Sequence, residues 1–472
     1  MNKNISNFLS NLSSTLMANI VTFLVSVFIL LVIPKVLGVE EYGYFQLYLL
    51  YSSYVIFFHL GLPNGIYLRY GGKEYKDLDK KMLSKQFWLI ALYTLLFAAI
   101  GSICALLFIG SEKKELVLLM TCLCGVIIIP RDFIIFLLMA TNRIKEYVKA
   151  TIIDRIIYIA TIFFFLTFST LDFTMLIIAD LVGKLVALTW LVYQCKDMIF
   201  QRIGQLRTGF YEAYLNIVVG SKILLSNIAS MLMIGIMRMG IEDHWDIATF
   251  GKISLTLSIS NLMMVVINAV SIVIYPILRR ADNDDLPKFY SILCNLFMVP
   301  LLGIMIFYYP MKELLALWLP SYAESLSYIA LLFSICIYES KMSMLVSTYL
   351  KILRKEKWIL IVNLVSVLVS FLFTIISIYV LSNLFLSIVS IVLVIAFRCI
   401  FAEMILSKYI KVDVKKDIYL ESLMCVIFMI SGWIFKNYLS TLLYAGCYIM
   451  YFMIKRMDVR ESIREIKAFV KK

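Results

Sequence analysis

Long, uninterrupted runs of apolar residues dominate this chain, and short polar segments separate them. A helix needs about 20 apolar residues to cross the hydrocarbon core of a bilayer, and fourteen stretches meet this requirement. They are 12–34, 44–62, 86–109, 115–140, 148–168, 173–193, 214–238, 247–275, 289–309, 326–350, 358–381, 384–406, 418–436 and 438–454. The runs are continuous, which disfavours the alternating pattern of membrane strands. The pattern therefore predicts an all-α polytopic membrane protein with about fourteen transmembrane helices.

Two ends of this pattern need interpretation. The last two stretches share a short hairpin at 436–440, which leaves twelve spanning helices as an open alternative. The first stretch follows a weakly charged leader, MNKNISNFLS, and lacks a small-residue cleavage site. We therefore interpret it as a retained helix and not as a signal peptide.

Composition supports a membrane protein and adds an orientation. Of the 472 residues, 62% are apolar and 16% are charged, whereas soluble domains are about half apolar and a quarter charged. The chain has 44 Lys and Arg against 31 Asp and Glu, a formal charge of +13. Thirty-one of the basic residues fall on one side of the predicted membrane and five on the other. The positive-inside rule then places both termini in the cytoplasm, and the basic surplus there favours contact with anionic lipids and not with nucleic acid.

Signatures of enzymes, pumps and metal sites are missing. The sequence has no GxxxxGK[ST] motif for nucleotide phosphates. Its two histidines, His59 and His244, lie on different spans, and no Cys/His cluster accompanies them. The pair Asp77 and Asp79 resembles a DxD motif, but it sits in a Lys-rich loop with no α/β domain around it. We expect a transporter without a cofactor or metal, and not an enzyme.

A weak internal repeat suggests two similar halves. The segment 35–45 after the first stretch resembles the segment 238–251 between the seventh and eighth, and both following helices end on a basic exit. A repeat of six helices gives two halves of the same orientation, with a binding site at their interface. The expected organisation is a six-helix lobe at 1–200, a second at 201–410, and two extra helices with a basic cytoplasmic tail at 411–472.

Charged residues inside the predicted spans are the candidate functional groups. A charge at the centre of a membrane helix costs about 3 kcal/mol or more, so it usually faces a wet cavity or a partner. The bases are Arg131, Arg155, Lys184, Lys222, Arg238, Lys252, Lys341 and Arg398, and the acids are Asp132, Asp154, Asp180, Glu339 and Glu403. Counted together they leave the membrane interior at +3.

Sequence spacing separates paired charges from unpaired ones. Asp180 and Lys184 are four residues apart, so they share a helix face and are expected to neutralise each other. The neighbours Asp154 and Arg155 lie near the cytoplasmic end of their helix, where the Arg side chain can reach the headgroups, so both readings remain open for them.

Six other cations remain as substrate-binding candidates. Four of them lie about two turns or more from a helix end and have no opposite charge three or four residues away: Arg131, Lys222, Lys341 and Arg398. The other two, Arg238 and Lys252, flank an outer loop beside the expected lobe interface. A cationic cavity suits an anionic substrate, and the planar fork of Arg matches phosphate oxygens. The five acids are candidates for proton or sodium coupling, or serve only as charge partners.

Several segments resemble one family over nearly the whole chain. LGVEEYGYFQL, HLGLPNGIYLRYGGKEY, TNRIKEYVKATIIDR, GSKILLSNIASMLMIGIMR and VIYPILRR resemble bacterial polysaccharide repeat-unit flippases of the Wzx type. These belong to the superfamily of multidrug, oligosaccharidyl-lipid and polysaccharide exporters. Relatives often carry an Asp before the Arg late in the seventh helix, whereas this chain has Met237 before Arg238. A coupling role for that acid is therefore in doubt here.

The resemblance implies a fold and a function. The fold has two six-helix lobes around a V-shaped cavity, followed by two further helices. The function is transfer of an undecaprenyl-diphosphate-linked oligosaccharide, for O-antigen or a related polysaccharide, across the bacterial cytoplasmic (inner) membrane. Partners would be membrane lipids, the polysaccharide polymerase and other assembly proteins. Three alternatives stay open: a MATE-like cation or drug antiporter, a lipid II flippase, and a membrane-embedded polymerase or ligase.

Overall fold

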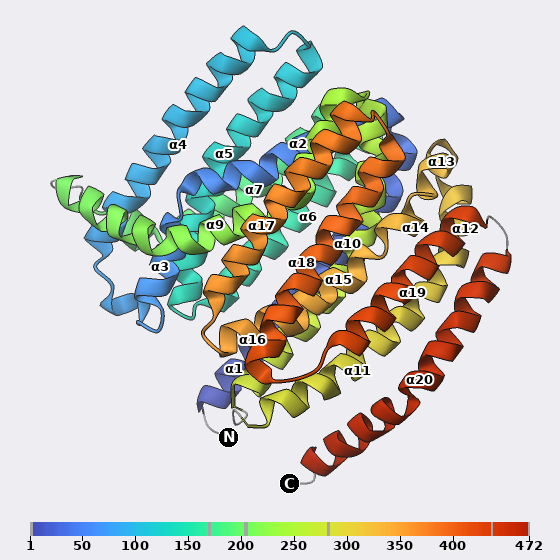
Figure 1. The fold of residues 1–472 in the computed structure, drawn as a ribbon. Helices are drawn as coiled ribbons and strands as arrows, with labels where there is room; N and C mark the ends of the chain where they lie inside the picture. Colours follow the sequence, from blue (N-terminus) through green and yellow to red (C-terminus); the bar gives the residue numbers. More distant parts are fainter. Residues whose placement is uncertain (1–2, 169–170, 203–205, 281–283, 436–437, 471–472) are drawn as a thin grey trace. The chain divides into compact units, whose positions relative to one another are not determined.

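The protein consists of helices in a computed structural model that describes residues 3–168, 171–202, 206–280, 284–435 and 438–470. No strand occurs within these ranges. The helices divide into two compact units, Met1–Ile228 and Ala229–Lys472 (Figure 1). The boundary falls inside a long helix, later along the chain than the boundary at 200/201 that the repeat suggests, and 411–472 belongs to the second unit.

In its described residues, unit 1 contains nine helices, the last of which continues into unit 2. They are α1 (Lys3–Val36), α2 (Val39–Val55), α3 (Leu62–Tyr70), α4 (Lys80–Phe108), α5 (Glu112–Ala140), α6 (Ile144–Phe168), α7 (Phe173–Gln194), α8 (Lys196–Ile199) and α9 (Leu206–His244).

Unit 2 begins within α9 and contains eleven further helices. They are α10 (Ile247–Arg280), α11 (Leu286–Ile304), α12 (Tyr308–Trp318), α13 (Ala323–Leu326), α14 (Ile329–Leu332), α15 (Ile335–Lys341), α16 (Ser347–Ile352), α17 (Glu356–Thr374), α18 (Leu384–Ile410), α19 (Lys415–Ile434) and α20 (Tyr438–Val470). A π-helical turn, Met342–Val346, joins α15 to α16.

The predicted apolar stretches fall on these helices, so the all-α polytopic prediction is confirmed. Eleven helical segments in the described part are long and apolar enough to cross a membrane, and the bent pair α2–α3 makes a twelfth. The stretches 247–275 and 438–454 lie on two further long helices, α10 and α20. Part of the hairpin at 436–440 lies outside the described residues. The chain is thus a multi-pass membrane protein.

The second predicted stretch is a broken helix. After α2, a short 3₁₀ turn ends at Leu60 and Gly61, which have φ angles of 56° and 85°, and α3 then leaves at 55° to α2. The backbone N–H of Gly61 donates to Nδ1 of His59 at 2.9 Å, which closes the turn. The helix α3 therefore extends past the end of the predicted stretch 44–62, to Tyr70.

Glycines let α3 pack closely against α9 within unit 1. A Cβ at Gly65 would lie 1.9 Å from the carbonyl oxygen of Asn216, and one at Gly220 would lie 2.0 Å from that of Gly61. Neither distance is sterically possible, so only glycine permits this backbone approach. Nearby, Arg69 of α3 donates to the side-chain oxygen of Asn216 at 2.8 Å. Helix α3 is therefore held against α9 by both shape and polar contacts.

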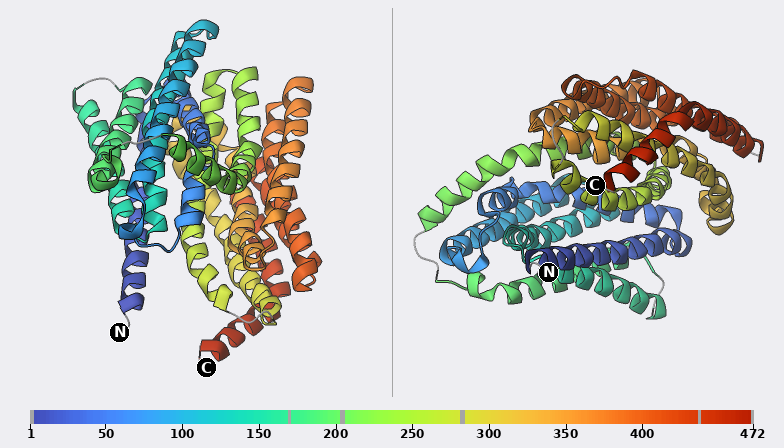
Figure 2. Two further views of the ribbon diagram at one scale, coloured as in Figure 1. Left: turned by 90° about the vertical axis from the view of Figure 1, so that its left-hand side faces the viewer. Right: turned by 90° about the horizontal axis from the view of Figure 1, so that it is seen from below.

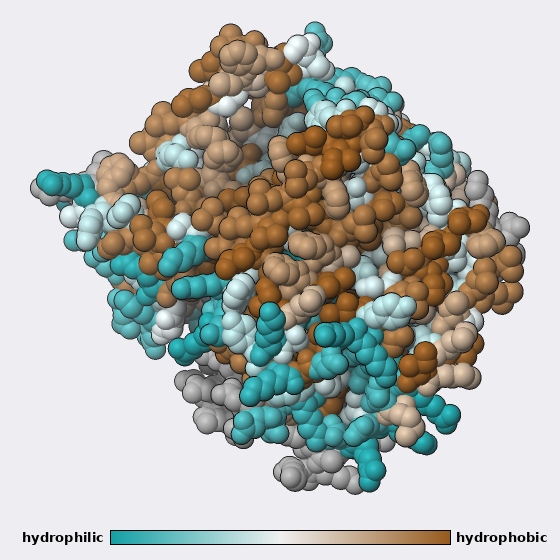
Figure 3. Space-filling model, viewed as in Figure 1, coloured by the Kyte–Doolittle hydropathy of each residue, from teal (hydrophilic) through white to brown (hydrophobic). Residues whose placement is uncertain are grey.

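The apolar helices differ strongly in burial. Only 17% of the apolar window of α4 and 28% of that of α17 is buried, against 89% for the segment Ile329–Ile352, which forms the centre of unit 2. Figure 3 shows apolar side chains in a broad band over α17, with hydrophilic side chains gathered toward its end near α16. Exposed apolar surface of this extent indicates helices that face lipid.

The last two helices are integral to unit 2. Helix α20 packs against α11 and α19 (Figures 1 and 2). The hydroxyls of Tyr444 and Tyr448 donate to the carbonyl oxygens of Leu302 and Val299 at 2.9 and 3.1 Å. The α19–α20 pair is thus fastened by specific hydrogen bonds as well as by apolar packing.

Candidate functional site

The charged groups inside unit 1 form ion pairs between helices. Arg131 on α5 lies 2.7 Å from a carboxylate oxygen of Asp154 on α6, and both side chains are largely buried. This corrects the expectation that Arg131 lacks a counter-charge, because its partner lies on another helix and outside the three- or four-residue spacing. Nε of Arg131 and Oδ1 of Asp154 have no hydrogen-bond partner among the residues that the structure describes.

The second pair in unit 1 is the one that sequence spacing predicts. Lys184 and Asp180, one turn apart on α7, form a buried ion pair. The hydroxyl of Tyr48 on α2 donates to the same carboxylate at 2.7 Å, and Lys184 also reaches the sulfur of Cys124 at 3.6 Å. The pair is therefore part of a polar network that joins α2, α5 and α7.

The intramembrane charges on α5, α6 and α7 balance one another. The three bases on α5, α6 and α7, Arg131, Arg155 and Lys184, match the three acids on the same helices, Asp132, Asp154 and Asp180, in number, and Lys222 on α9 adds one positive charge. Asp132 is buried, with no hydrogen bond or ion pair to any described residue. The network offers fixed, compensated charge and no net attraction for an anion.

Unit 2 contains a more strongly buried cluster, which we call the Lys341 cluster: Lys341, Glu403, Glu421 and Tyr290. The ammonium of Lys341 on α15 lies 2.7 Å from a carboxylate oxygen of Glu403 on α18 and 2.7 Å from one of Glu421 on α19. The side chains of the three charged residues are 1–6% exposed. Tyr290 on α11 donates to Glu403 at 2.7 Å.

Arg398 is also paired. Its guanidinium lies 2.7 Å from Glu339 and donates to the side-chain oxygen of Asn363 at 3.0 Å. Glu339, Asn363 and Arg398 lie on three different helices, α15, α17 and α18, so a search for opposite charges one turn away does not find this ion pair. Arg398 and Lys341 are therefore each held by ion pairs with carboxylates in this conformation.

The sequence reasoning left out Glu421, which lies near the start of the predicted stretch 418–436. With Glu421 included, the two bases Lys341 and Arg398 face three carboxylates, Glu339, Glu403 and Glu421. The buried interior of unit 2 is thus net negative when all of them are ionised. Including Glu421 changes the interior count of eight bases and five acids to eight bases and six acids, which is +2.

The remaining three of the six candidate cations are exposed or half-buried. Lys222 on α9 is exposed and makes no ion pair with any described residue. Arg238, also on α9, is half-buried, donates to the hydroxyl of Ser254 at 2.9 Å and lies over the ring of Phe250. Lys252 on α10 is half-buried. A role of any of the six in substrate binding stays a prediction.

Metal chemistry has no support within the described ranges, where no group of three or more His, Cys, Asp or Glu side chains could hold an ion. His59 is committed to the turn before α3. His244 contacts the rings of Trp245 and Tyr379.

Three solved membrane transporters share this fold. The lipid II flippase MurJ, in an inward closed conformation, has a TM-score of 0.66 at 13% identity, over 95% of this chain and 99% of that chain. An inward-facing MATE-family multidrug transporter of the MOP superfamily has 0.62 at 14% identity, over 82% and 94%. A MOP superfamily transporter from Pyrococcus furiosus has 0.52 at 13%, over 85% and 93%.

No family model and no curated protein matches the chain. At these low identities, the structural matches establish the fold alone. The chain shares the architecture of a lipid II flippase and of two MOP superfamily transporters.

Proposed function

We propose that this protein moves a lipid-linked oligosaccharide, carried on undecaprenyl diphosphate, from the cytoplasmic to the outer leaflet of a bacterial cytoplasmic membrane. The observation that carries the proposal is the match to a flippase of a lipid-linked precursor, which covers 95% of this chain, against 82% for the multidrug transporter. The segment resemblance to polysaccharide flippases supports an oligosaccharide as the cargo.

The exposed and half-buried cations of this protein suit a cargo with a diphosphate. The lipid tail stays in the bilayer, while the diphosphate and sugars need a polar path with cationic contacts. Lys222, Arg238 and Lys252 are the first candidates for these contacts, because their side chains are exposed or half-buried in this conformation, whereas those of Lys341 and Arg398 are buried. Arg131, Lys341 and Arg398 become contacts only in a conformation that opens their ion pairs. Transport then follows from alternating access between two states.

Energy coupling is proposed to run through the excess carboxylate of unit 2. Two carboxylates share one ammonium in the Lys341 cluster, so one negative charge is left without a cation in a dry environment. A charge of that kind is stabilised by binding a proton or a small cation. Glu403, with Glu421 beside it, is therefore preferred over Asp154 and Asp180, which each have a basic partner of their own.

A lipid II flippase is the second candidate, because the structural match itself is to such a protein. The two candidates differ in the group that is attached to the lipid diphosphate. A cation or drug antiporter is less well supported, since the match is shorter.

The test uses purified protein in lipid vesicles that contain one fluorescent substrate at a time: an undecaprenyl-diphosphate-linked repeat unit, lipid II, or no lipid substrate but an external cationic dye. The proposal expects protein-dependent transfer of the repeat unit between leaflets. Transfer of lipid II alone would establish the second candidate, and dye uptake alone would establish an antiporter. In cells, deletion of the gene should leave lipid-linked repeat units in the cytoplasmic leaflet and remove the surface polysaccharide.

A further inference from the structure

Unit 1 carries a hollow where α5 ends, α6 begins and α7 ends. It has a volume of about 450 Å³ and is lined by Asn142, Arg143, Ile144, Lys145, Glu146, Lys149, Trp190 and Gln194. A second hollow, of about 980 Å³, adjoins it and shares Asn142 and Arg143 with it. By the charge asymmetry of the chain, both lie at the cytoplasmic face of the membrane.

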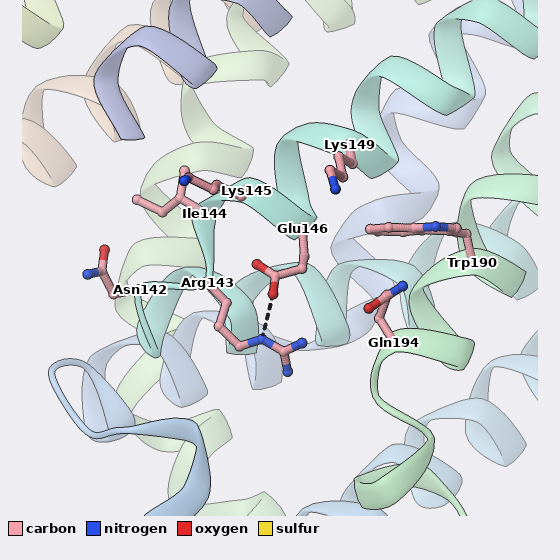
Figure 4. A pocket seen from close by; sticks show the side chains of 8 residues that line it. All are labelled: Asn142, Arg143, Ile144, Lys145, Glu146, Lys149, Trp190 and Gln194. Carbon is pink, nitrogen blue, oxygen red and sulfur yellow. Dashed lines mark hydrogen bonds and ion pairs between the residues drawn. The ribbon is translucent and has the colours of Figure 1, made fainter. Parts of the chain in front are cut away.

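The smaller hollow is cationic. Nε of Arg143 donates to Glu146 at 3.0 Å, so these two charges compensate each other. Lys145 and Lys149, one turn apart on α6, are exposed, and neither makes an ion pair with any residue in the described part of the chain. Figure 4 shows the polar ends of Arg143, Glu146 and Gln194 directed into one space. The hollow therefore has a surplus of two positive charges.

Arg143 is held in a fixed position. Its guanidinium lies 4.3 Å from the ring centre of Tyr75, whose hydroxyl donates to Asp197 at 3.0 Å, and Lys80 pairs with the same carboxylate at 2.7 Å. The terminal nitrogens of Arg143 donate to no described residue. They are thus positioned for a ligand at little conformational cost, and a guanidinium fork of this kind matches phosphate oxygens.

The other side of the hollow is apolar and faces lipid. Trp190 is half-buried, and Val186 and Tyr193, one turn away on the same face of α7, are 36% and 64% exposed. Tryptophan and tyrosine at a helix end are typical of the boundary between headgroups and hydrocarbon. A ligand with a phosphate in the hollow and a chain along α7 would satisfy both halves of this surface.

We propose that this hollow is a binding site for the phosphate headgroup of an anionic phospholipid of the cytoplasmic leaflet. The phosphate lies between Lys145, Lys149 and the terminal nitrogens of Arg143, and the acyl chain lies against the lipid-facing side of α7. Basic pockets at the cytoplasmic ends of membrane helices bind lipid headgroups in this way. The site is independent of the translocated lipid, because it depends on the topology and not on the cargo.

The test measures binding of phosphatidylglycerol to the purified full-length protein in detergent by native mass spectrometry. The variant Lys145→Ala/Lys149→Ala is compared with Lys351→Ala/Lys355→Ala, a second pair of exposed lysines four residues apart on the same predicted side. With each lysine near a membrane surface worth about a fivefold change, the first variant should lose phosphatidylglycerol affinity by roughly 10- to 30-fold. The second variant should change by about twofold or less.

Competing ligands identify the source of the phosphate. Phosphatidylcholine should bind wild type and both variants equally weakly, and millimolar inorganic phosphate should not displace phosphatidylglycerol. Equal losses in the two variants, or displacement by free phosphate, would overturn the proposal. The proposal would also be overturned if binding of undecaprenyl diphosphate depended on Lys145 and Lys149 and binding of phosphatidylglycerol did not, since the hollow would then be a binding site for the cargo. None of these measurements requires flipping activity, so failure of the proposed function leaves them interpretable.

Discussion

The Lys341 cluster makes a sharp prediction about charge inside unit 2. Replacing Lys341 by Met removes the ammonium and leaves Glu403 and Glu421 facing each other among side chains that are almost completely buried. The volume change is small, so the effect is mainly electrostatic. Replacing Glu421 by Gln instead leaves one acid and one base, a balanced pair.

The magnitude follows from the geometry. Each carboxylate has an oxygen 2.7 Å from the same nitrogen, which places those oxygens about 4 to 5 Å apart. Two negative charges at about that distance repel by roughly 3 to 4 kcal/mol at an effective dielectric constant near 20. Removing one partner of a buried ion pair costs a similar amount, about 3 to 5 kcal/mol. Protonation of a carboxylate relieves part of this cost.

The assay is thermal unfolding of the purified protein at about pH 8 and about pH 5. Lys341→Met should be destabilised strongly at the higher pH and less at the lower pH, because protonation removes the repulsion. The triple variant Lys341→Met/Glu403→Gln/Glu421→Gln should recover most of the loss, and Glu421→Gln should stay within about 1 kcal/mol of wild type. Lys222→Met, an exposed control, should change stability by about 0.5 kcal/mol or less.

The reasoning fails if Lys341→Met unfolds at the wild-type temperature at both pH values, or if the triple variant is no more stable than Lys341→Met. In the first case the carboxylates would not depend on the ammonium. In the second, the loss would come from packing around Lys341 and not from its charge.

Three further predictions concern other parts of the chain. Gly65→Ala should lower unfolding stability by about 1 to 3 kcal/mol or more, because its Cβ would lie 1.9 Å from a backbone oxygen of α9, whereas Gly38→Ala, with open space around the Cβ, should be tolerated. Lys222→Ala should reduce repeat-unit transfer in vesicles while leaving membrane abundance unchanged, and unchanged transfer would remove Lys222 from the cargo path. Burial alone would raise the pKa of Asp197, but hydrogen bonds and charge from Lys80 outweigh it and lower that pKa. The ion pair of Asp197 with Lys80 therefore stabilises the protein at neutral pH, and this stabilisation is lost as the pH falls through the lowered pKa, below about 3.9. Protease sensitivity of this segment should rise over that pH range. The variant Asp197→Asn should show no such pH dependence.

The sequence by itself determined the class of protein and its helices. Apolar stretches such as 115–140 and 384–406 became the long helices α5 and α18. This follows because a bilayer forces every backbone polar group into internal hydrogen bonds. The pair Asp180 and Lys184 was also readable, since residues four apart meet on one helix face.

The tertiary structure decided the fate of the remaining charges. Arg131, Lys341 and Arg398 have no acid one turn away in sequence, yet each meets a carboxylate from another helix. Spacing along the chain carries no record of such pairs, because they depend on how helices rotate and pack. Glu421 illustrates the same limit, since its burial depends on α19 packing within unit 2 and not on its place in an apolar run.

The break between α2 and α3 had a local signal, Gly61 and Pro63 on either side of Leu62, but the packing that results from the break had none. Only the folded chain shows that the resulting helix α3 lies with its glycine against the backbone of α9. The hollow beside Trp190 likewise gathers Lys149 and Gln194 from different helices. Local backbone preferences act over a few residues, whereas a site forms where distant segments pack together, and that information is present only in three dimensions.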